Sequence, residues 1–259
     1  MDKLTNRKRR KMIKTPEQIE GIRRAGKLNT AVLDEVAKRI HGGMTTEDIN
    51  TIVHEYTIKH GGIPAPLNYE GFPKSVCTSV NEVVCHGIPS KEEMLVEGDI
   101  VNVDVTTILD GYFADASRMF IIGKTTPERE RLVKVAKRCM ELGIAAIKPG
   151  ARLSDIGYAI TQYAHEQGYY VVRDLTGHGV GLKFHEDPDV DHYAKKPGRG
   201  LLLEPGMVLT VEPMINEGTW KVFVDEEDDW TVVNEDELDS AQWEKTVLIT
   251  ETGTEIISY

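Results

Sequence analysis

Residues 40–61, IHGGMTTEDINTIVHEYTIKHG, and residues 147–168, IKPGARLSDIGYAITQYAHEQG, decide the fold of this chain. The two stretches carry the same residue at six positions that lie 107 residues apart. In the first stretch these residues are Ile40, Gly43, Asp48, Ile49, Tyr56 and Gly61. Six matches in a 22-residue window exceed chance, although any two amphipathic helices share a few. The match predicts that a helix–helix–strand unit occurs twice in the chain.

Helix boundary signals around each stretch agree with a duplication. Thr15-Pro16-Glu17-Gln18 combines a capping threonine, a proline suited to the first turn and a glutamine that completes a capping box, so a helix begins there. That helix ends at Gly42-Gly43, and Thr45 can cap a second one that ends at Gly61-Gly62. In the second half Thr126-Pro127-Glu128 opens a helix that ends near Pro149-Gly150, and Ser154 can cap another that ends near Gly168.

Strand-like sequence follows each pair of helices. It occupies residues 99–109 and 112–122 in the first half, and residues 169–172, 207–212, 230–233 and 242–250 in the second. No Ser/Gly-rich linker separates the halves, so we expect one domain over residues 15–259, with halves of about 15–123 and 124–259. This α/β (α+β) architecture places a site at the interface of the halves, where pockets commonly form.

The dipeptide Asp110-Gly111, between two apolar-rich runs, predicts a two-residue hairpin with a type I′ turn. Facing residues then have numbers that sum to 221, so Asp115 lies opposite Thr106 and Asp104 lies on the same face, two residues along. The two aspartates are diagonal neighbours about 7–8 Å apart at the backbone. Two buried acids need compensation, which a metal ion can supply. Alternatively both acids face solvent, and Val103 and Val105 form the buried face.

Further polar residues stand in similar settings. His178 lies between two glycines, which let the backbone approach a ligand or a metal closely, and His185 follows seven residues later. Glu212 ends an apolar run before Pro213, and Glu244 interrupts another. Each of these residues alone is more often structural or solvated than part of a site.

Taken together, six motifs in this order resemble the type I methionine aminopeptidases, in their bacterial form, of the M24 metallopeptidase family. The motifs are Asn81-Glu82-Val83-Val84-Cys85-His86-Gly87-Ile88-Pro89, Val101-Asn102-Val103-Asp104-Val105, Asp115, Gly177-His178-Gly179, Val211-Glu212-Pro213-Met214 and Gln242-Trp243-Glu244-Lys245-Thr246. The resemblance runs from about Thr15 to the C-terminus. It implies the pita-bread fold, whose two pseudo-symmetric halves agree with the repeat.

The resemblance also implies a set of metal ligands, namely Asp104, Asp115, His178, Glu212 and Glu244. In the family the second and the last of these bridge two divalent ions. Four carboxylates and one imidazole suit manganese, iron or cobalt. Zinc usually prefers more nitrogen or sulfur ligands but stays open.

The implied activity is removal of the initiator methionine from the N-termini of nascent polypeptides when the second residue is small. Hydroxide activated by the metals hydrolyses the first peptide bond. Glu212 resembles the family's proton shuttle, and His86 and His185 resemble the two histidines that hydrogen-bond to the scissile amide and the developing oxyanion.

The resemblance further implies an apolar pocket that selects methionine. Its residues are expected to be Tyr69, Phe72, Cys77, Phe184 and Trp230. Two positions depart from the pattern expected in related chains. Phe72 stands where a tyrosine is expected, and Pro66 where a small residue or cysteine is expected. The rim of the pocket is therefore expected to differ from that of related enzymes.

The charge distribution bears on partners. The chain has a net charge of −11, which argues against a DNA-binding protein. Residues 1–14 nevertheless carry seven basic groups and one acidic group. We interpret this segment as a solvated basic tail, or alternatively, through residues 3–14, as an electrostatic contact with ribosomal RNA phosphates.

Composition indicates a cytoplasmic protein. No apolar run approaches the roughly 20 residues that span a bilayer, and the N-terminus lacks an apolar signal stretch, so no membrane contact is expected. Cys77, Cys85 and Cys139 are odd in number and form no Cys-x-x-Cys pair, which indicates reduced thiols. By resemblance the protein is expected to be a monomer.

Two rival functions stay open at this point. An X-Pro aminopeptidase or prolidase of the same fold shares the five ligand types, but usually carries a large extra N-terminal domain, and about fourteen residues precede the repeat here. A non-catalytic protein of this fold that binds RNA or the ribosome typically lacks metal ligands, and all five ligand types are present here.

Overall fold

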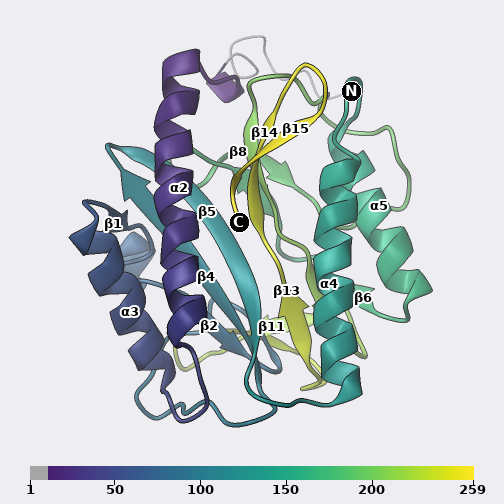
Figure 1. Ribbon diagram of the computed structural model, residues 1–259. Helices are drawn as coiled ribbons and strands as arrows, with labels where there is room; N and C mark the ends of the chain where they lie inside the picture. The colour runs from purple at the N-terminus through teal and green to yellow at the C-terminus, as the bar shows by residue number, and fades with distance from the viewer. Residues whose placement is uncertain (1–10) are drawn as a thin grey trace.

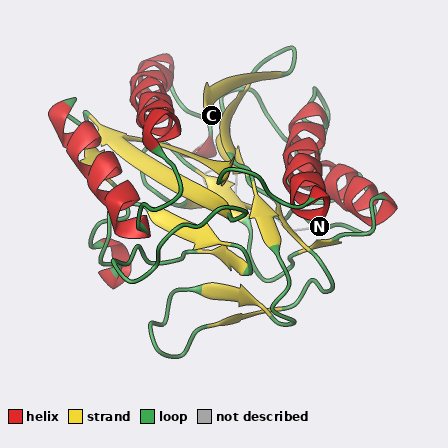
Figure 2. Cartoon of the chain, turned by 60° about the horizontal axis from the view of Figure 1, so that its bottom comes forward, coloured by secondary structure: helices red, strands yellow, loops and turns green. Residues whose placement is uncertain are grey.

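The computed structural model describes residues 11–259. Strands occupy the middle of the molecule, with helices α2 (Pro16–Arg39) and α3 (Thr46–Lys59) on one side and α4 (Pro127–Ala145) and α5 (Leu153–Glu166) on the other (Figure 1). In a view turned by 60° the helices again lie outside and the strands between them (Figure 2). Each helix pair comes from one copy of the repeat, so the predicted architecture of two helix–helix–strand halves is confirmed.

Three of the four predicted helix starts are confirmed, with Thr15, Thr45 and Thr126 at the cap positions. The prediction for Ser154 is wrong, because α5 begins at Leu153 with Arg152 at its cap position. Asp155 Oδ2 accepts a hydrogen bond from the Arg152 backbone N–H at 2.7 Å. The side-chain hydroxyl of Ser154 instead accepts one from the Arg199 N–H. This helix start is therefore marked by Asp155, three residues after the cap position, and not by a hydroxyl at the cap position.

The ends of α3 and α5 repeat each other in detail. Gly61 and Gly168 have φ angles of 81° and 83°, in the left-handed region where glycine is favoured after a helix. Just beyond each, a backbone N–H returns to the last helical turn. Gly62 donates to the Thr57 carbonyl at 3.0 Å, and Tyr169 donates to the Ala164 carbonyl at 2.9 Å. The sequence repeat is therefore also a repeat of backbone hydrogen bonds.

The predicted hairpin is formed by β4 (Ile100–Leu109) and β5 (Tyr112–Ile121) in the expected register, with Thr106 opposite Asp115. The turn residues Asp110 and Gly111 have φ angles of 52° and 80°, as a type I′ turn requires. Strands β1 (Ile63–Pro64) and β2 (Cys77–Val80) also pair with β4 and complete this sheet.

The remaining strands form three antiparallel sheets. The largest has the order β15-β14-β9-β7-β8, and the others have the orders β13-β10-β6 and β11-β12-β3. The bounds are β3 (Val83–Cys85), β6 (Tyr170–Val171), β7 (Gly177–Gly179), β8 (Glu186–Val190), β9 (Val208–Val211), β10 (Met214–Asn216), β11 (Val222–Val224), β12 (Val232–Asn234), β13 (Ser240–Gln242), β14 (Lys245–Ile249) and β15 (Thr254–Ser258). The expected strand over residues 242–250 is interrupted at Trp243-Glu244. Glu244 therefore lies where the chain passes from one sheet to another.

The apolar core follows the two halves. One cluster lies within residues 28–122, and a larger one is built mostly from residues 132–249 and reaches the first half at Ile100 and Met119. A third cluster joins α2 to the five-stranded sheet through Ile22, Val180 and Leu248. Apolar packing thus fixes the two halves against each other, at about 25 cal/mol for each Å² of apolar surface buried.

The segment before α2 is packed onto the domain where it is described. Met12 is buried, and Ile13 forms a β-bridge with Met207. The assignment of Lys14 to a solvated tail is wrong, because its ammonium is buried against Glu186. The basic residues between Lys3 and Arg10 lie outside the described residues.

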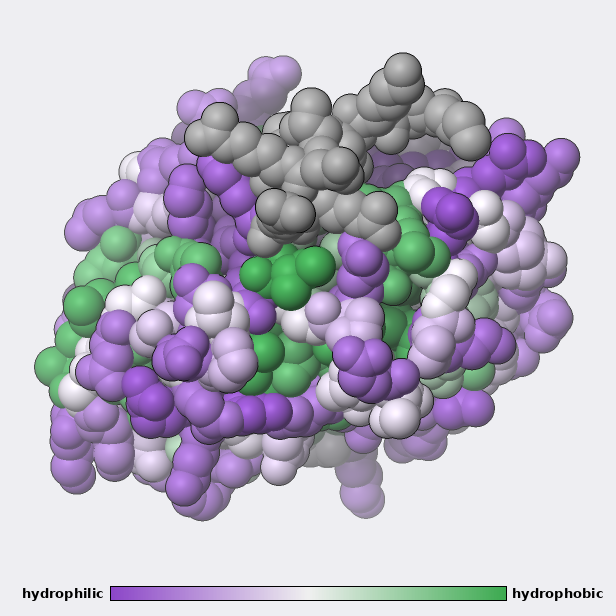
Figure 3. Space-filling model, turned by 90° about the horizontal axis from the view of Figure 1, so that it is seen from above, coloured by the Kyte–Doolittle hydropathy of each residue, from purple (hydrophilic) through white to green (hydrophobic). Residues whose placement is uncertain are grey.

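The face seen from above is mostly hydrophilic, with separate groups of hydrophobic residues near the middle of the view and at its left edge (Figure 3). Scattered exposed hydrophobic residues are ordinary on protein surfaces. Within residues 11–259, the structure contains no helix with the length and apolar character needed to cross a bilayer.

Candidate active site

A cavity of about 530 Å³ lies between the two halves. All twelve site residues expected from the sequence line it. They are Tyr69, Phe72, Cys77, His86, Asp104, Asp115, His178, Phe184, His185, Glu212, Trp230 and Glu244. Residues separated by up to 175 positions in the chain thus meet in one place, while their individual roles stay predictions.

Four carboxylates reach the cavity from strands of both halves. Asp104 and Asp115 lie on β4 and β5, Glu212 directly follows β9, and Glu244 directly precedes β14. Thr246 on β14 joins the two sheets, because its hydroxyl donates to the Asp115 carbonyl at 2.7 Å and accepts from the Asp115 N–H at 3.1 Å. The interface between the halves therefore sets the distance between the two pairs of acids.

Neighbouring hydroxyl and amide groups orient two of these carboxylates. Thr106 Oγ1 donates to Asp115 Oδ1 at 2.8 Å, across the hairpin. Thr210 Oγ1 donates to Glu212 Oε1 at 2.6 Å, and Gln242 Nε2 donates to Glu212 Oε2 at 3.3 Å. These contacts hold each carboxylate in one orientation before any ligand arrives.

His178 presents one ring nitrogen to the acids. Its Nδ1 donates to the Gly179 carbonyl at 3.0 Å, which leaves a lone pair on Nε2. Nε2 lies 3.7 Å from Asp115 Oδ2 and 3.6 Å from Glu212 Oε1. Burial lowers the pKa of His178 to about 3, so the ring is neutral at physiological pH. A neutral imidazole fixed in this way is a suitable metal ligand.

Burial also raises the pKa of the acids. It raises the pKa of Asp104 to about 6 and that of Glu212 to about 8. Burial first, and then the charges of the neighbouring carboxylates, raise the pKa values of Asp115 and Glu244 well above their ordinary range. Four acids this close are not all ionised at neutral pH without a compensating positive charge.

The donor set fits divalent metal ions. Ligand atoms of Asp115, His178 and Glu244 lie within 4.8 Å of one another. Asp104 Oδ1 and Glu244 Oε1 are buried and have no hydrogen-bond partner among residues 11–259. Buried polar atoms nearly always have a partner, so these two oxygens are available as ligands. The residues present therefore fit the metal ions that the motifs imply.

The raised pKa values predict how the metal-free protein responds to pH. An acid whose pKa is higher in the folded than in the unfolded state stabilises the fold at low pH, and this contribution is lost as pH rises through the folded-state pKa. For Asp104 and Glu212 that window runs from about pH 4 to about pH 8. We expect the melting temperature of the metal-free protein to fall by roughly 5 °C or more between pH 5 and pH 8.

Calorimetry at several pH values with chelator present measures this fall. Saturating Mn²⁺ should remove most of it at pH 8 and change little at pH 5, where the acids are protonated. A melting temperature of the metal-free protein that rises between pH 5 and pH 8 would contradict this assignment of the pKa shifts.

Two histidines that are not expected ligands also face the cavity. Burial lowers the pKa of His86 to about 4, and its ring lies 6.3 Å from that of Trp230. His185 lies with its Nδ1 2.8 Å from the Tyr69 hydroxyl and stacks on Phe184 at 4.3 Å. When Tyr69 donates to Nδ1, Nε2 of His185 carries the proton and can donate to a ligand.

Aromatic side chains line the cavity beside these polar groups. Phe72 and Trp230 meet edge to face at 5.2 Å, and Tyr69 lies 4.8 Å from Phe184. Cys77 on β2 is paired in register with Asp104, so the thiol lies close to the acids. This combination of aromatic rings and a sulfur atom suits an unbranched apolar side chain.

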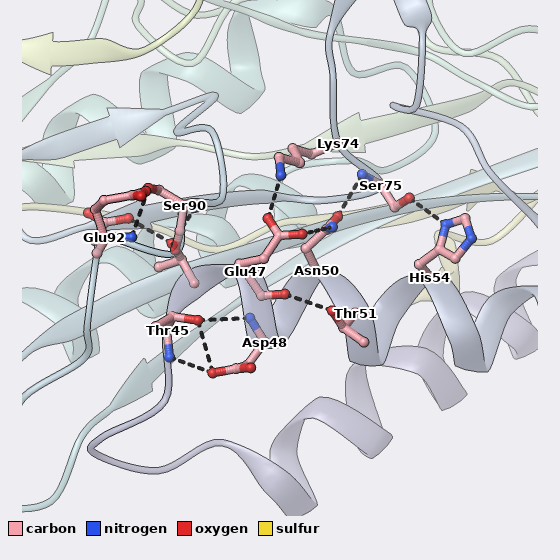
Figure 4. A network of polar contacts seen from close by, with 12 residues as sticks. Thr45, Glu47, Asp48, Asn50, Thr51, His54, Lys74, Ser75, Ser90 and Glu92 are labelled. Atoms are coloured by element: carbon pink, nitrogen blue, oxygen red, sulfur yellow. Dashed lines mark hydrogen bonds and ion pairs between the residues drawn. The ribbon is translucent and has the colours of Figure 1, made fainter.

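A polar network on α3 holds the segment between Phe72 and Cys77 (Figure 4). Asn50 Oδ1 accepts from the Ser75 N–H at 2.8 Å, and His54 Nδ1 lies 2.8 Å from the Ser75 hydroxyl. Lys74 forms an ion pair with Glu47 on the same helix. Helix α3 thus fixes one wall of the cavity.

Several cavity residues were not singled out as site residues from the sequence. They include Cys85, Leu175, Met214 and Gln242. Cys85, Met214 and Gln242 lie inside the motifs quoted above, so their position in a motif could have indicated that they line the site. His192 does not line the cavity, but its Nε2 accepts from the Glu212 backbone N–H at 3.0 Å. Nothing local in the sequence indicates that contact.

Comparison with known proteins gives consistent matches. The model of metallopeptidase family M24 matches residues 20–251. Methionine aminopeptidase A of Synechocystis sp. is 51% identical over 242 residues, which cover 93% of this chain and 94% of that protein. The methionine aminopeptidase of Rickettsia prowazekii is 47% identical over 246 residues, which cover 95% of this chain and 94% of that protein.

Comparison of the fold with solved structures leads to the same family as comparison of the sequence. The crystal structure of methionine aminopeptidase from Rickettsia prowazekii superposes with a TM-score of 0.93 at 46% identity. The superposition covers 95% of this chain and 99% of that one. The pita-bread fold expected from the sequence is thereby confirmed.

Proposed function

Since this chain belongs to metallopeptidase family M24 and to the methionine aminopeptidases within it, we propose that its cavity removes the initiator methionine from nascent polypeptides. The first peptide bond is hydrolysed when the residue after methionine is small. The X-Pro aminopeptidase alternative is not favoured, because the relatives described above at 47% identity or more are methionine aminopeptidases.

One observation carries the proposal. Five side chains that offer oxygen or imidazole ligand atoms line the same cavity as several aromatic rings and two thiols. The polar side supplies the hydrolytic chemistry, and the apolar side accepts a thioether side chain. Tyr69, Phe72, Cys77, Phe184 and Trp230 are proposed to form the methionine pocket.

The five donors Asp104, Asp115, His178, Glu212 and Glu244 are proposed to hold two divalent ions, with Co²⁺, Mn²⁺ and Fe²⁺ as the candidates and Zn²⁺ as an alternative. When bound, such ions supply Lewis-acid activation of a water molecule and of the scissile carbonyl. Glu212 would take a proton from the attacking water molecule and pass it to the leaving amine. Its Oε1 is held by a hydrogen bond from the Thr210 hydroxyl, which orients the carboxylate for this transfer.

The two remaining histidines orient the substrate. His86 and His185 are neutral at physiological pH, because burial lowers the pKa of each. Each can therefore donate one N–H to the scissile amide or to its oxygen as negative charge develops there. The Tyr69 hydroxyl at Nδ1 of His185 selects the tautomer that donates from Nε2.

The metal-restoration assay tests the proposal directly. Protein stripped with chelator is assayed for release of methionine from Met-Ala-Ser, with Mn²⁺, Fe²⁺, Co²⁺ or Zn²⁺ added back without oxygen. Activity should return for the wild type and stay at least about 10²-fold lower for Asp104→Ala, which lacks one ligand. Folded, metal-loaded wild type that cleaves x-Pro-x peptides but not Met-Ala-Ser would overturn the proposed substrate.

We also propose that the enzyme acts as a monomer in the cytoplasm, as the family resemblance implies. The basic residues between Lys3 and Lys11 are proposed to contact ribosomal RNA phosphates. Co-sedimentation with ribosomes that is unchanged after deletion of residues 2–11 would count against this contact.

A further inference from the structure

A buried ion pair links the segment before α2 to the loop that carries the cavity residues Phe184 and His185, and Glu186 itself also lines the cavity. Lys14 Nζ lies 2.5 Å from Glu186 Oε2, and the two side chains are 1% and 14% exposed. Glu186 begins β8 and follows Phe184 and His185 directly. The pair spans 172 residues of sequence and joins the segment before α2 to the loop between β7 and β8.

The same carboxylate also fixes the backbone of that loop. Glu186 Oε1 accepts from the Leu182 N–H at 2.6 Å and from the Lys183 N–H at 2.9 Å. The Glu186 carboxylate thus binds two backbone N–H groups of the loop with Oε1 and the Lys14 ammonium with Oε2. A charge-assisted contact of this kind, away from water, is stronger and more directional than an exposed one.

Lys14 is held in place independently of Glu186. Its backbone N–H donates to the Gly206 carbonyl at 2.9 Å, and α2 starts two residues later behind the Thr15 cap. The loop packs closely against α2 and Lys14 at Gly181. A Cβ added at Gly181 would lie 2.4 Å from Ile22 Cδ1 and 3.4 Å from Lys14 Cε. The backbone of Lys14 is therefore held in position by contacts that do not involve Glu186.

We propose that Lys14 is a positioning residue for His185, a role that rests on the proposed aminopeptidase function. Lys14 fixes Glu186, Glu186 fixes the loop over residues 182–186, and the loop sets where the His185 ring meets the substrate. The His185 ring has a second contact that is independent of Lys14, because the Tyr69 hydroxyl lies 2.8 Å from its Nδ1. A shift of about 1 Å at a catalytic group can lower a rate about 10²-fold.

The test is Lys14→Met, which keeps the unbranched stem and removes the charge. We expect kcat for Met-Ala-Ser to fall about 10- to 100-fold while KM and metal content change less than about threefold. Lys134→Met is the matched control, because Lys134 forms an exposed ion pair with Glu130, and it should retain wild-type kcat. If Lys14→Met does not fold, Lys14→Gln, which keeps an N–H donor, takes its place in the same measurement.

A double-mutant cycle separates positioning from general destabilisation. In the His185→Ala background, Lys14→Met should lower kcat less than about twofold further, because the group it positions is already absent. A full 10-fold loss in that background, or unchanged kcat for Lys14→Met beside an active wild type, overturns the role of Lys14. A wild type inactive on Met-Ala-Ser after metal loading would instead count against the proposed function itself.

Discussion

Replacing Asp115 by asparagine is expected to lower kcat/KM for methionine release by at least about 10³-fold and to reduce the bound metal. Asp115 lies at the centre of the acid cluster. Its Oδ1 accepts from Thr106, its Oδ2 lies 3.7 Å from His178 Nε2, and its ligand atom is close to those of His178 and Glu244. Asparagine keeps the shape but removes the charge, and its NH₂ group cannot act as a ligand.

Metal content by elemental analysis and steady-state kinetics measure the two effects on the same sample. The matched control is Asp110→Asn in the turn of the same hairpin. Its side chain is 65% exposed, and asparagine accepts its positive φ, so activity and metal content should both be retained. Wild-type metal content together with wild-type kcat/KM in Asp115→Asn would rule out Asp115 as a ligand.

The hairpin part of the candidate site could be predicted from local signals, whereas its other residues were expected from the family resemblance. The turn at Asp110-Gly111 fixes the register of the hairpin, and the register places Asp104 and Asp115 on one face. The two copies of the helical repeat are also local, since each is marked by its own caps and glycines. Local patterns survive folding when tertiary packing agrees with them, as it does here.

The contacts that orient the site could not be predicted in the same way. The hydrogen bond from the Glu212 N–H to His192, and the ion pair between Lys14 and Glu186, join residues that are distant in sequence. Lys14 illustrates the reason. In a run of basic residues it has the pattern of a solvated tail, and only the packing of β8 beside the start of α2 shows that it is buried.

Short strands rich in glycine and proline were also missed. β7 consists of Gly177, His178 and Gly179, and β8 includes Pro188. Neither has the run of β-branched or aromatic residues that indicates a strand, since β8 has Val190 alone and β7 has none. β7 pairs with β9, and β8 pairs with β7, so the existence of both strands depends on the sheet rather than on their own sequence.

Replacing Glu212 by glutamine is expected to lower kcat about 10²- to 10⁴-fold, the range associated with loss of a positioned general acid or base. The new side chain can be accommodated, because its oxygen can still accept from Thr210. The loss would therefore reflect the changed chemistry of residue 212, as proton carrier and as metal ligand, rather than a collapsed site.

The same substitution is expected to raise the stability of the metal-free protein at high pH while it lowers activity. Burial raises the pKa of Glu212 to about 8, so ionisation of this group destabilises the metal-free fold as pH rises from about 4.5 to about 8. Glutamine cannot ionise, and metal-free Glu212→Gln should melt higher than the wild type at pH 8.5 and at nearly the same temperature at pH 5. Glu217→Gln is the matched control, since burial also raises the pKa of Glu217 but its side chain does not line the cavity. Retained kcat in Glu212→Gln would remove this residue from the proton-transfer step, whereas lost activity with raised stability at high pH is the pairing that a buried proton shuttle predicts.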